Sequence, residues 1–264
     1  MLVHFSKYHG TGNDFVMIDG RKQDTAFLNN DLIRRLCDRR FGIGGDGLII
    51  LEDSTDFDFR MRYYNADGRE GTMCGNGGRC ITSFAYKIGA CDENCTFEGI
   101  DGKHEASILK NGEIRLRLKD VHGIETMEDG YLLDTGSPHF IKFVPDIEKT
   151  DVEHDGAGIR NQARFGPGGV NANFVELGPL DDQISVRTFE RGVEAETWSC
   201  GTGVSAAAIA ASLHTGSDNL TYRVLTRGGD LRVSFSVKPF QHYTGIYLTG
   251  PASHVYDGTI EIVI

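Results

Sequence analysis

The sequence has little proline, no excess of positive charge and no long apolar run. It contains 6 prolines against 34 glycines, and its formal net charge is −11. Neither nucleic acid nor an anionic membrane favours an acidic surface, so neither is expected as a partner. No stretch approaches the length of a membrane span, and no secretory signal is visible at the N-terminus. These absences predict a water-soluble, cytoplasmic protein.

The 264 residues are 39% apolar and 25% charged, which is enough for one large domain or two modest ones. Six cysteines stand at positions 37, 74, 80, 91, 95 and 200. Without a secretory signal, they are expected to be reduced thiols and not a disulfide framework. Cys91 and Cys95 could form half of a zinc site. No second pair with suitable spacing accompanies them, so no metal is expected.

Short β-branched and aromatic segments, bounded by Gly, Asp and Asn, predict many strands. The expected strands are Leu2–Lys7, Phe15–Asp19, Gly47–Glu52, Phe57–Tyr64, Glu105–Leu109, Glu113–Leu118, Phe140–Phe143, Ala172–Leu177, Gln183–Phe189, Leu220–Thr226, Asp230–Lys238, Thr244–Leu248 and Thr259–Val263. Three helices are expected, at Asn30–Arg40 with Asn30 or Asp31 as its cap, at Gly78–Ile88 and at Gly203–His214.

Two parts of the chain repeat each other. The segments "FRMRYYNADGREGTMCGNGGRC" (59–80) and "ISVRTFERGVEAETWSCGTGVSA" (184–206) both run from a strand through a turn to a cysteine and a helix. In this match Asn65 corresponds to Glu190. A weaker echo links "GNDFVMI" (12–18) with "NANFVEL" (171–177). Such self-similarity predicts a duplicated domain, whose copies are expected to face each other across a pseudo-twofold axis.

Cys74 and Cys200 each precede a glycine-rich turn that opens a helix. The first N–H groups of a helix can hold a carboxylate, and its positive end stabilises a thiolate. Two such cysteines on opposing walls of one cleft would suit the inversion of a stereocentre, which needs an acid and a base on opposite faces of one carbon. No lysine stands in a recognisable cofactor-anchoring motif, so pyridoxal phosphate is not required and no cofactor is expected.

These motifs together resemble the diaminopimelate epimerase family. They are "GTGNDF" (10–15), "YNADG" (64–68), "MCGNGGRC" (73–80), "GSPH" (136–139), "ERG" (190–192), "SCGTG" (199–203) and "GPASHVYDG" (250–258). The resemblance implies an α/β (α+β) fold of two pseudo-symmetric domains, each a β-barrel-like sheet around a central helix, with the active site in the cleft between them. The expected halves are residues 1–119 with 252–264, carrying Cys74, and residues 120–251, carrying Cys200.

The resemblance also implies a function. A homodimeric isomerase would interconvert LL-2,6-diaminopimelate and meso-diaminopimelate, for lysine and peptidoglycan synthesis, without a cofactor. Cys74 and Cys200 would be the acid–base pair. The implied substrate-binding residues are Asn13, Asn65, Gly75, Asn76, Asn171, Glu190, Arg191, Gly201 and Thr202, with Arg191 on the distal carboxylate. His139 and Glu190 would tune the thiol pKa values. Ser137 and Gly47 depart from residues found in other members of the family.

Other interpretations stay open at this point. Cys74 and Cys200 could be buried structural thiols, the three asparagines could serve turns, and Arg191 could pair with Glu194 or Glu196. Two other enzyme activities are also considered. One is that of a proline racemase or hydroxyproline epimerase. The other is that of a cysteine hydrolase or amidotransferase, with Cys74 as nucleophile and His139 as base. A carboxylate-binding protein without activity is a further alternative.

Overall fold

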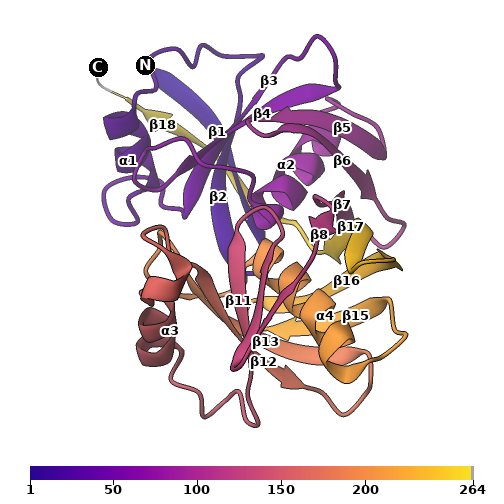
Figure 1. Cartoon of the computed structure of the whole chain (residues 1–264). Coiled ribbons are helices and arrows are strands. Elements are labelled where there is room, and N and C mark those ends of the chain that lie inside the picture. Colours follow the sequence, from indigo (N-terminus) through magenta and orange to yellow (C-terminus); the bar gives the residue numbers. More distant parts are fainter. Residues whose placement is uncertain (263–264) are drawn as a thin grey trace. The chain divides into compact units, whose positions relative to one another are not determined.

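The computed structural model describes residues 1–262, and the chain divides into two units. Unit 1 comprises Met1–Leu116 and Gly250–Ile264, and unit 2 comprises Arg117–Thr249. These bounds lie within a few residues of the expected division at 119/120 and 251/252. Each unit is a curved β-sheet around a helix (Figure 1). Across residues 1–262, no helix has the length and apolar character needed to cross a membrane.

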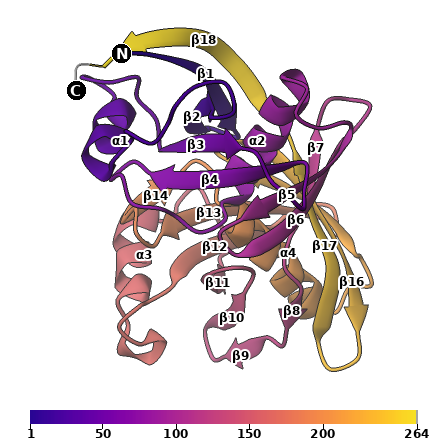
Figure 2. The same ribbon diagram turned by 90° about the horizontal axis from the view of Figure 1, so that it is seen from above.

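The strands of unit 1 pair in the order β18-β1-β2-β3-β4-β5-β6-β7. Figure 2 shows β18 running beside β1, so the chain's last described strand forms one edge of the sheet next to its first strand. The strand bounds are β1 (Leu2–Gly10), β2 (Asn13–Asp19), β3 (Gly47–Glu52), β4 (Phe59–Asn65), β5 (Asn94–Gly99), β6 (Gly102–Ile108), β7 (Ile114–Arg117) and β18 (Ser253–Glu261). The expected strand at Thr259–Val263 is thus the end of a longer strand, and its residue 263 lies outside the described residues.

The strands of unit 2 pair in the order β9-β10-β11-β12-β13-β15-β16-β17-β8, and the short β14 pairs with the end of β13. The strand bounds are β8 (Val121–His122), β9 (Glu125–Met127), β10 (Gly130–Asp134), β11 (Pro138–Phe143), β12 (Asn171–Leu177), β13 (Gln183–Glu190), β14 (Ala195–Thr197), β15 (Thr221–Thr226), β16 (Gly229–Lys238) and β17 (His242–Gly250).

The two units share one order of strand pairings. In unit 1, β1 to β6 pair successively as antiparallel, parallel, antiparallel, parallel and antiparallel neighbours. The same alternation relates β10, β11, β12, β13, β15 and β16 of unit 2. The predicted duplication is therefore confirmed. The weaker echo between residues 12–18 and 171–177 is wrong, because the counterpart of β2 is β11 and the counterpart of β12 is β3.

The helices are α1 (Asn30–Cys37), α2 (Gly75–Lys87), α3 (Val152–Arg160) and α4 (Gly201–Thr215), with a short 3-10 turn at Ala163–Phe165. Helix α1 is capped one residue earlier than expected, because the Asn29 side chain accepts a hydrogen bond from the Leu32 N–H at 3.0 Å. The prediction missed α3, whose segment "VEHDGAGIR" has two glycines and little apolar periodicity. The repeat carried the signal for it, since α3 follows β11 as α1 follows β2.

Helices α2 and α4 are the centres of the two sheets. Helix α2 packs against β1, β2, β3 and β6, and α4 packs against β11, β12, β13, β15 and β16. Residues 203–211 of α4 are all buried, and most of them are alanine or glycine. Small side chains on every face let the strands approach the helix from all directions, as a fully buried helix requires. Both helices begin earlier than expected, directly after Cys74 and Cys200.

The cysteines do not all behave as expected. Cys91 and Cys95 form a disulfide, with their Cα atoms 5.6 Å apart. The prediction that all six cysteines are reduced thiols is therefore wrong for this pair. The loop after α2 turns back on itself before β5, which brings the two Cα atoms to a separation that a disulfide bridges. These two sulfur atoms are consequently not thiolate ligands, and Cys37, Cys74, Cys80 and Cys200 remain as reduced thiols.

Candidate half-sites around two helix-capping cysteines

The four reduced thiols fall into two kinds. Cys37 and Cys80 lie inside helices and are buried, and burial raises the pKa of each thiol to about 12. At neutral pH both stay protonated, so neither can act as a base. Cys74 and Cys200 instead cap the first turns of α2 and α4. Their carbonyl oxygens accept the N–H groups of Gly78 and Val204, so each sulfur-bearing residue stands at the positive end of its helix.

Three predicted residues of unit 1 meet at the start of α2. The Cys74 Sγ lies 3.6 Å from the Asn13 Oδ1, and the Asn76 Nδ2 donates to the same oxygen at 3.3 Å. The Asn13 Nδ2 donates to the Asp46 carboxylate at 2.7 Å. Because a carboxylate can only accept, Asp46 decides which way the Asn13 amide points, and its oxygen faces Cys74. The sequence reasoning did not include Asp46.

Arg79 is a second residue that the sequence reasoning missed. Its side chain is fully buried and donates to the Asn76 Oδ1 at 3.0 Å, to the Thr11 Oγ1 at 3.2 Å and to the Gly75 carbonyl at 3.2 Å. No carboxylate within residues 1–262 forms an ion pair with it. Since guanidinium only donates, Arg79 orients the Asn76 amide in the way that Asp46 orients Asn13. Helical spacing was the available signal, because Arg79 follows Gly75 by four residues and Asn76 by three.

Asn65 lies at the end of β4, at an exposed turn. Its Oδ1 accepts from the Tyr63 hydroxyl at 2.8 Å. Gly47 lies directly opposite Asn65 in the β3–β4 ladder. A Cβ at Gly47 would lie 2.6 Å from the Tyr63 Cε2 and 2.6 Å from the Tyr64 carbonyl oxygen. The Tyr63 ring therefore fills the space that a side chain at Gly47 would take, which is the physical reason that glycine stands there.

In unit 2, three predicted residues meet at the start of α4. The Cys200 Sγ lies 3.5 Å from the Thr202 Oγ1, and the His139 Nε2 lies 3.0 Å from that same hydroxyl. His139 is fully buried, and burial together with the nearby positive charge of Arg191 lowers its pKa to about 3. The imidazole is therefore neutral at physiological pH. His139 can orient a hydroxyl beside Cys200, but a group with this pKa is a weak general base.

The hydrogen-bond partners of His139 bear on the hydrolase interpretation. Its Nε2 meets the Ser137 and Thr202 hydroxyls, each at 3.0 Å, and its Nδ1 meets the Asn173 Nδ2 at 3.2 Å. All these partners belong to unit 2. A nucleophilic Cys74 activated by His139 is not supported, because both ring nitrogens are engaged elsewhere and the ring is hard to protonate.

Asn171 joins Ser137 to Arg191. Its Nδ2 donates to the Ser137 Oγ and to the Pro138 carbonyl, both at 3.1 Å, and its Oδ1 accepts the Arg191 backbone N–H at 2.9 Å. The structure thus gives Asn171 a positioning role in the loop that carries Arg191. Ser137, one of the two expected departures from the family, supplies the oxygen that both Asn171 and His139 contact.

The Arg191 side chain is half-buried, and no carboxylate in the described part of the chain forms an ion pair with it. The alternative partners considered from the sequence are engaged with other arginines. Glu194 pairs with Arg160 at 3.0 Å. Glu196 pairs with Arg187 at 2.7 Å and with Arg227 at 3.0 Å. Neither glutamate forms an ion pair with Arg191, although the nearby charge of Arg191 helps to lower the pKa of Glu194 after its hydrogen bonds from the Gly192 N–H and Arg160.

Glu190 is the last residue of β13, as Asn65 is the last residue of β4. The two residues thus hold equivalent places in the repeat. Gly201, like Gly75, is the first residue of its helix. Its N–H is therefore one of the first-turn donors that have no acceptor within the helix. In both units the predicted site residues therefore lie at helix starts or near strand ends, with Arg191 in the turn that follows β13.

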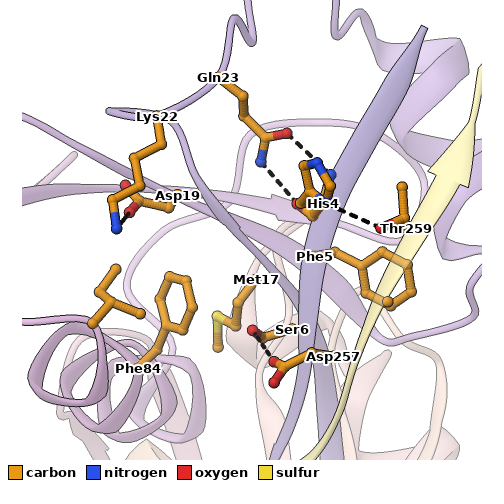
Figure 3. Close-up of a pocket in the computed structure, with 12 residues that line it drawn as sticks. His4, Phe5, Ser6, Met17, Asp19, Lys22, Gln23, Phe84, Asp257 and Thr259 are labelled. Carbon is orange, nitrogen blue, oxygen red and sulfur yellow. Dashed lines mark hydrogen bonds and ion pairs between the residues drawn. The ribbon is translucent and has the colours of Figure 1, made fainter.

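A separate pocket of about 500 Å³ lies on unit 1 over β1, β2 and β18 (Figure 3). It has an apolar floor that includes Phe5, Met17 and Phe84. Its polar rim is internally bonded, as in the contact of Ser6 with Asp257 at 2.5 Å. None of the predicted site residues lines this pocket. It is therefore distinct from the half-site at Cys74.

The chain resembles known proteins in sequence. The sequence profile described as diaminopimelate epimerase matches residues 5–121 and 131–255. The curated diaminopimelate epimerase of Flavobacterium psychrophilum is 49% identical over 96% of this chain and 98% of its own length. That of Chlorobaculum tepidum is 42% identical over 96% of this chain and 99% of its own length.

Solved structures show that the fold is shared more widely. A phenazine biosynthesis protein of the PhzF family from Bacillus anthracis superposes with a TM-score of 0.77 at 15% identity, covering 99% of this chain and 100% of its own. A probable proline racemase from Agrobacterium radiobacter superposes with a TM-score of 0.73 at 16% identity, covering 99% and 93%. At such identities the likeness concerns the fold alone. The profile match and the close curated relatives, by contrast, concern the whole sequence, and the chain belongs to the diaminopimelate epimerase family.

Proposed function

We propose that this protein interconverts LL-2,6-diaminopimelate and meso-diaminopimelate, with Cys74 and Cys200 as the two acid–base groups and without a cofactor. The observation that carries the proposal is the pair of reduced thiols at the N-termini of two equivalent helices. Cys74 and Cys200 each cap a glycine-rich first turn, and Cys200 is buried there. The other two reduced thiols lie within helices instead, where burial raises the pKa of each. Relatives named diaminopimelate epimerase at 49% and 42% identity support the substrate.

In this mechanism one sulfur, as thiolate, takes the α-hydrogen as a proton, and the other, as thiol, delivers a proton to the opposite face of the same carbon. The electron pair left on the α-carbon spreads into the adjacent carboxylate. The first-turn N–H groups of Gly75, Asn76, Gly201 and Thr202 would bind that carboxylate and stabilise its growing charge. One proton leaves and one arrives, so the two sulfur atoms exchange protonation states in each turnover.

The remaining predicted residues would hold the parts of the substrate that do not react. Arg191, which has no carboxylate partner among the described residues, would bind the distal carboxylate through its planar guanidinium. Asn13, Asn65 and Glu190 would contact the polar groups, and Asn171 would position Arg191 through its backbone. His139 would act on Cys200 through Thr202. Glu190, at the strand end equivalent to that of Asn65, would contribute to the tuning of the thiols.

The test follows the α-hydrogen. The protein is incubated with LL-diaminopimelate in deuterated water, and the stereochemistry and the deuterium content of the α-carbon are measured together. Meso product carrying solvent deuterium is the expected result. Cys74→Ala and Cys200→Ala should each abolish turnover. Cys80→Ala is the matched control, because its thiol lies on α2 but is buried. Full activity of Cys200→Ala, or release of ammonia by the wild type, would overturn the proposal.

The same function suggests the setting in which the protein works. Its substrate and product are small amino acids of lysine and peptidoglycan synthesis, so we place it in the cytoplasm, with neither nucleic acid nor membrane as partner. We further propose a homodimer. Sedimentation equilibrium of the full chain would test this, since a monomer at working concentrations would contradict it.

A further inference from the structure

We propose that Asn173 is a positioning residue of the Cys200 half-site: it holds His139 as the tautomer protonated on Nε2, which leaves the Thr202 hydroxyl hydrogen directed at the Cys200 sulfur. The inference rests on the proposed function for its catalytic consequence. Its structural part, the place of one proton on His139, stands by itself. Asn173 was not among the predicted site residues, although it follows Asn171 by two and so points to the same side of β12.

The orientation of the Asn173 amide is determined by its neighbours. The side chain is fully buried, and its Nδ2 lies 3.1 Å from the Phe140 carbonyl oxygen and 3.2 Å from the Asn171 carbonyl oxygen. Its Oδ1 accepts from the Thr188 hydroxyl at 2.9 Å. A backbone carbonyl can only accept, so the end of the amide that faces Phe140 and Asn171 must be the NH₂ group. A flipped amide would place oxygen against two oxygens.

The orientation of Asn173 in turn selects the His139 tautomer. Its NH₂ group lies 3.2 Å from the His139 Nδ1. The two hydrogens of the NH₂ group face three acceptors, so one hydrogen is shared between two of them. A protonated Nδ1 would bring one N–H against another, which makes Nδ1 the acceptor. In a neutral imidazole the single proton then resides on Nε2.

The tautomer decides which way the neighbouring hydroxyl groups donate. The Nε2 lies 3.0 Å from both the Ser137 and the Thr202 oxygens. If Nε2 carries the proton, neither hydroxyl can donate to it, and its one hydrogen is shared between the two oxygens or accepted by one of them. The Thr202 hydrogen is then available to the Cys200 Sγ at 3.5 Å. A hydroxyl that donates to sulfur stabilises the thiolate over the thiol. With the other tautomer, Nε2 would compete for that hydrogen.

The packing around these groups holds the arrangement in place. Gly203, the third residue after Cys200, has no side chain, and a Cβ there would lie 2.4 Å from the Asn173 Oδ1 and 3.3 Å from the His139 Nδ1. Gly203, the second glycine of the "SCGTG" segment, thus leaves space for the Asn173–His139 contact beside the first turn of α4. The arrangement belongs wholly to unit 2.

The experiment locates the proton by NMR. The full chain is labelled with ¹⁵N in its histidine rings, and His139 is assigned by its absence from the spectrum of His139→Gln. We expect the wild type to show hydrogen on Nε2 alone at neutral pH. In Asn173→Asp an acceptor replaces the donor, so Nδ1 should become protonated. Thr188→Val is the matched control. It removes the hydroxyl on the far side of Asn173, is equally buried, and should leave the proton on Nε2.

Activity provides the second readout. NMR first establishes an alkaline pH at which the His139 ring of Asn173→Asp is neutral and protonated on Nδ1. At that pH the kcat/KM of the variant for diaminopimelate epimerisation should be about 10- to 100-fold below that of the wild type. This is the loss expected for one hydrogen bond to a charged group. Thr188→Val should stay within about threefold of the wild type, the effect of a neutral hydrogen bond at most.

The outcomes separate this inference from the proposed function. A wild-type proton on Nδ1 overturns the assignment even if Asn173→Asp fails to fold. An unchanged kcat/KM in a variant whose tautomer has moved overturns the catalytic role. A wild type that shows Nε2–H but does not epimerise diaminopimelate supports the role of Asn173 on His139 and refutes the proposed function instead.

Discussion

Replacing Gly203 by alanine adds one methyl group at the most crowded point of the Cys200 half-site. The new Cβ would lie 2.4 Å from the Asn173 Oδ1 and 3.2 Å from the His139 Cε1. Two effects of opposite sign compete. Alanine is the better helix former and stabilises a helix interior by about 1 kcal/mol relative to glycine. The methyl group also overpacks a filled interior, which costs about 1–3 kcal/mol.

The surroundings of Asn173 decide which effect wins. Its amide is held by the Thr188 hydroxyl, by two backbone carbonyls and by His139, so it cannot rotate without leaving buried polar groups unpaired. Each such group costs a further 1–3 kcal/mol or so. We therefore expect Gly203→Ala to lower the free energy of unfolding by about 1–5 kcal/mol, and the melting temperature by roughly 2–4 °C for each kcal/mol.

The assay is urea and thermal unfolding of Gly203→Ala beside Gly158→Ala. Gly158 is also a helical glycine, in α3, but a Cβ there meets nothing within 4 Å. That variant should gain about 0.5–1 kcal/mol. Adding Asn173→Ala to Gly203→Ala should recover part of the loss as a favourable coupling energy. If Gly203→Ala proves as stable as the wild type, Asn173 is not held as described, and the reasoning fails.

Three further perturbations follow from unit 1. Gly47→Gln should destabilise the protein in urea and not improve KM, because Tyr63 fills the site; an unchanged stability would contradict this. Arg79→Met should lower the unfolding free energy by about 2 kcal/mol or more and reduce kcat/KM, since the Asn76 Oδ1 loses its buried donor; a variant with wild-type stability and kinetics would argue against it. Asp14 has a pKa lowered to about 2, because hydrogen bonds from Arg39 and Lys7 outweigh the opposing effect of burial. Because the pKa of Asp14 is lowered in the folded state, its contribution to stability is present above about pH 4 and is lost as the pH falls towards 2. Thermal unfolding should therefore show Asp14→Asn to be less stable than the wild type by about 2 kcal/mol at neutral pH. Near pH 2 the two proteins should be equally stable.

Much of the candidate site could be read from the sequence because its signals are local or repeated. A cysteine followed by glycines at the start of a helix is a pattern of a few adjacent residues, and it occurs twice. The match of Asn65 with Glu190 in the repeat predicted that the two residues hold equivalent places, and both lie at strand ends. The two central helices were predicted, but their first turns were not, because glycine is a poor helix former and local propensity starts the helix too late.

Residues that act through distant partners escaped this reasoning. Arg79 resembles any helical arginine until the fold buries it beneath Asn76, and Asn173 resembles a strand residue until β12 is set beside β11, where His139 lies. The disulfide between Cys91 and Cys95 depended on the path of one loop. Helix α3 lacks apolar periodicity and is stabilised by packing on β12 and β13, which local sequence does not reveal.

The sequence by itself determined the duplication, the two thiols at helix starts and the membership of a family. The thiols and the family motifs are patterns of neighbouring residues, and the duplication follows from the likeness of one half of the chain to the other. Only the tertiary structure decided which amides, hydroxyls and charges surround each thiol and which way they donate. Those contacts join residues far apart in the chain, and their geometry follows from strand register and from the packing of a buried helix.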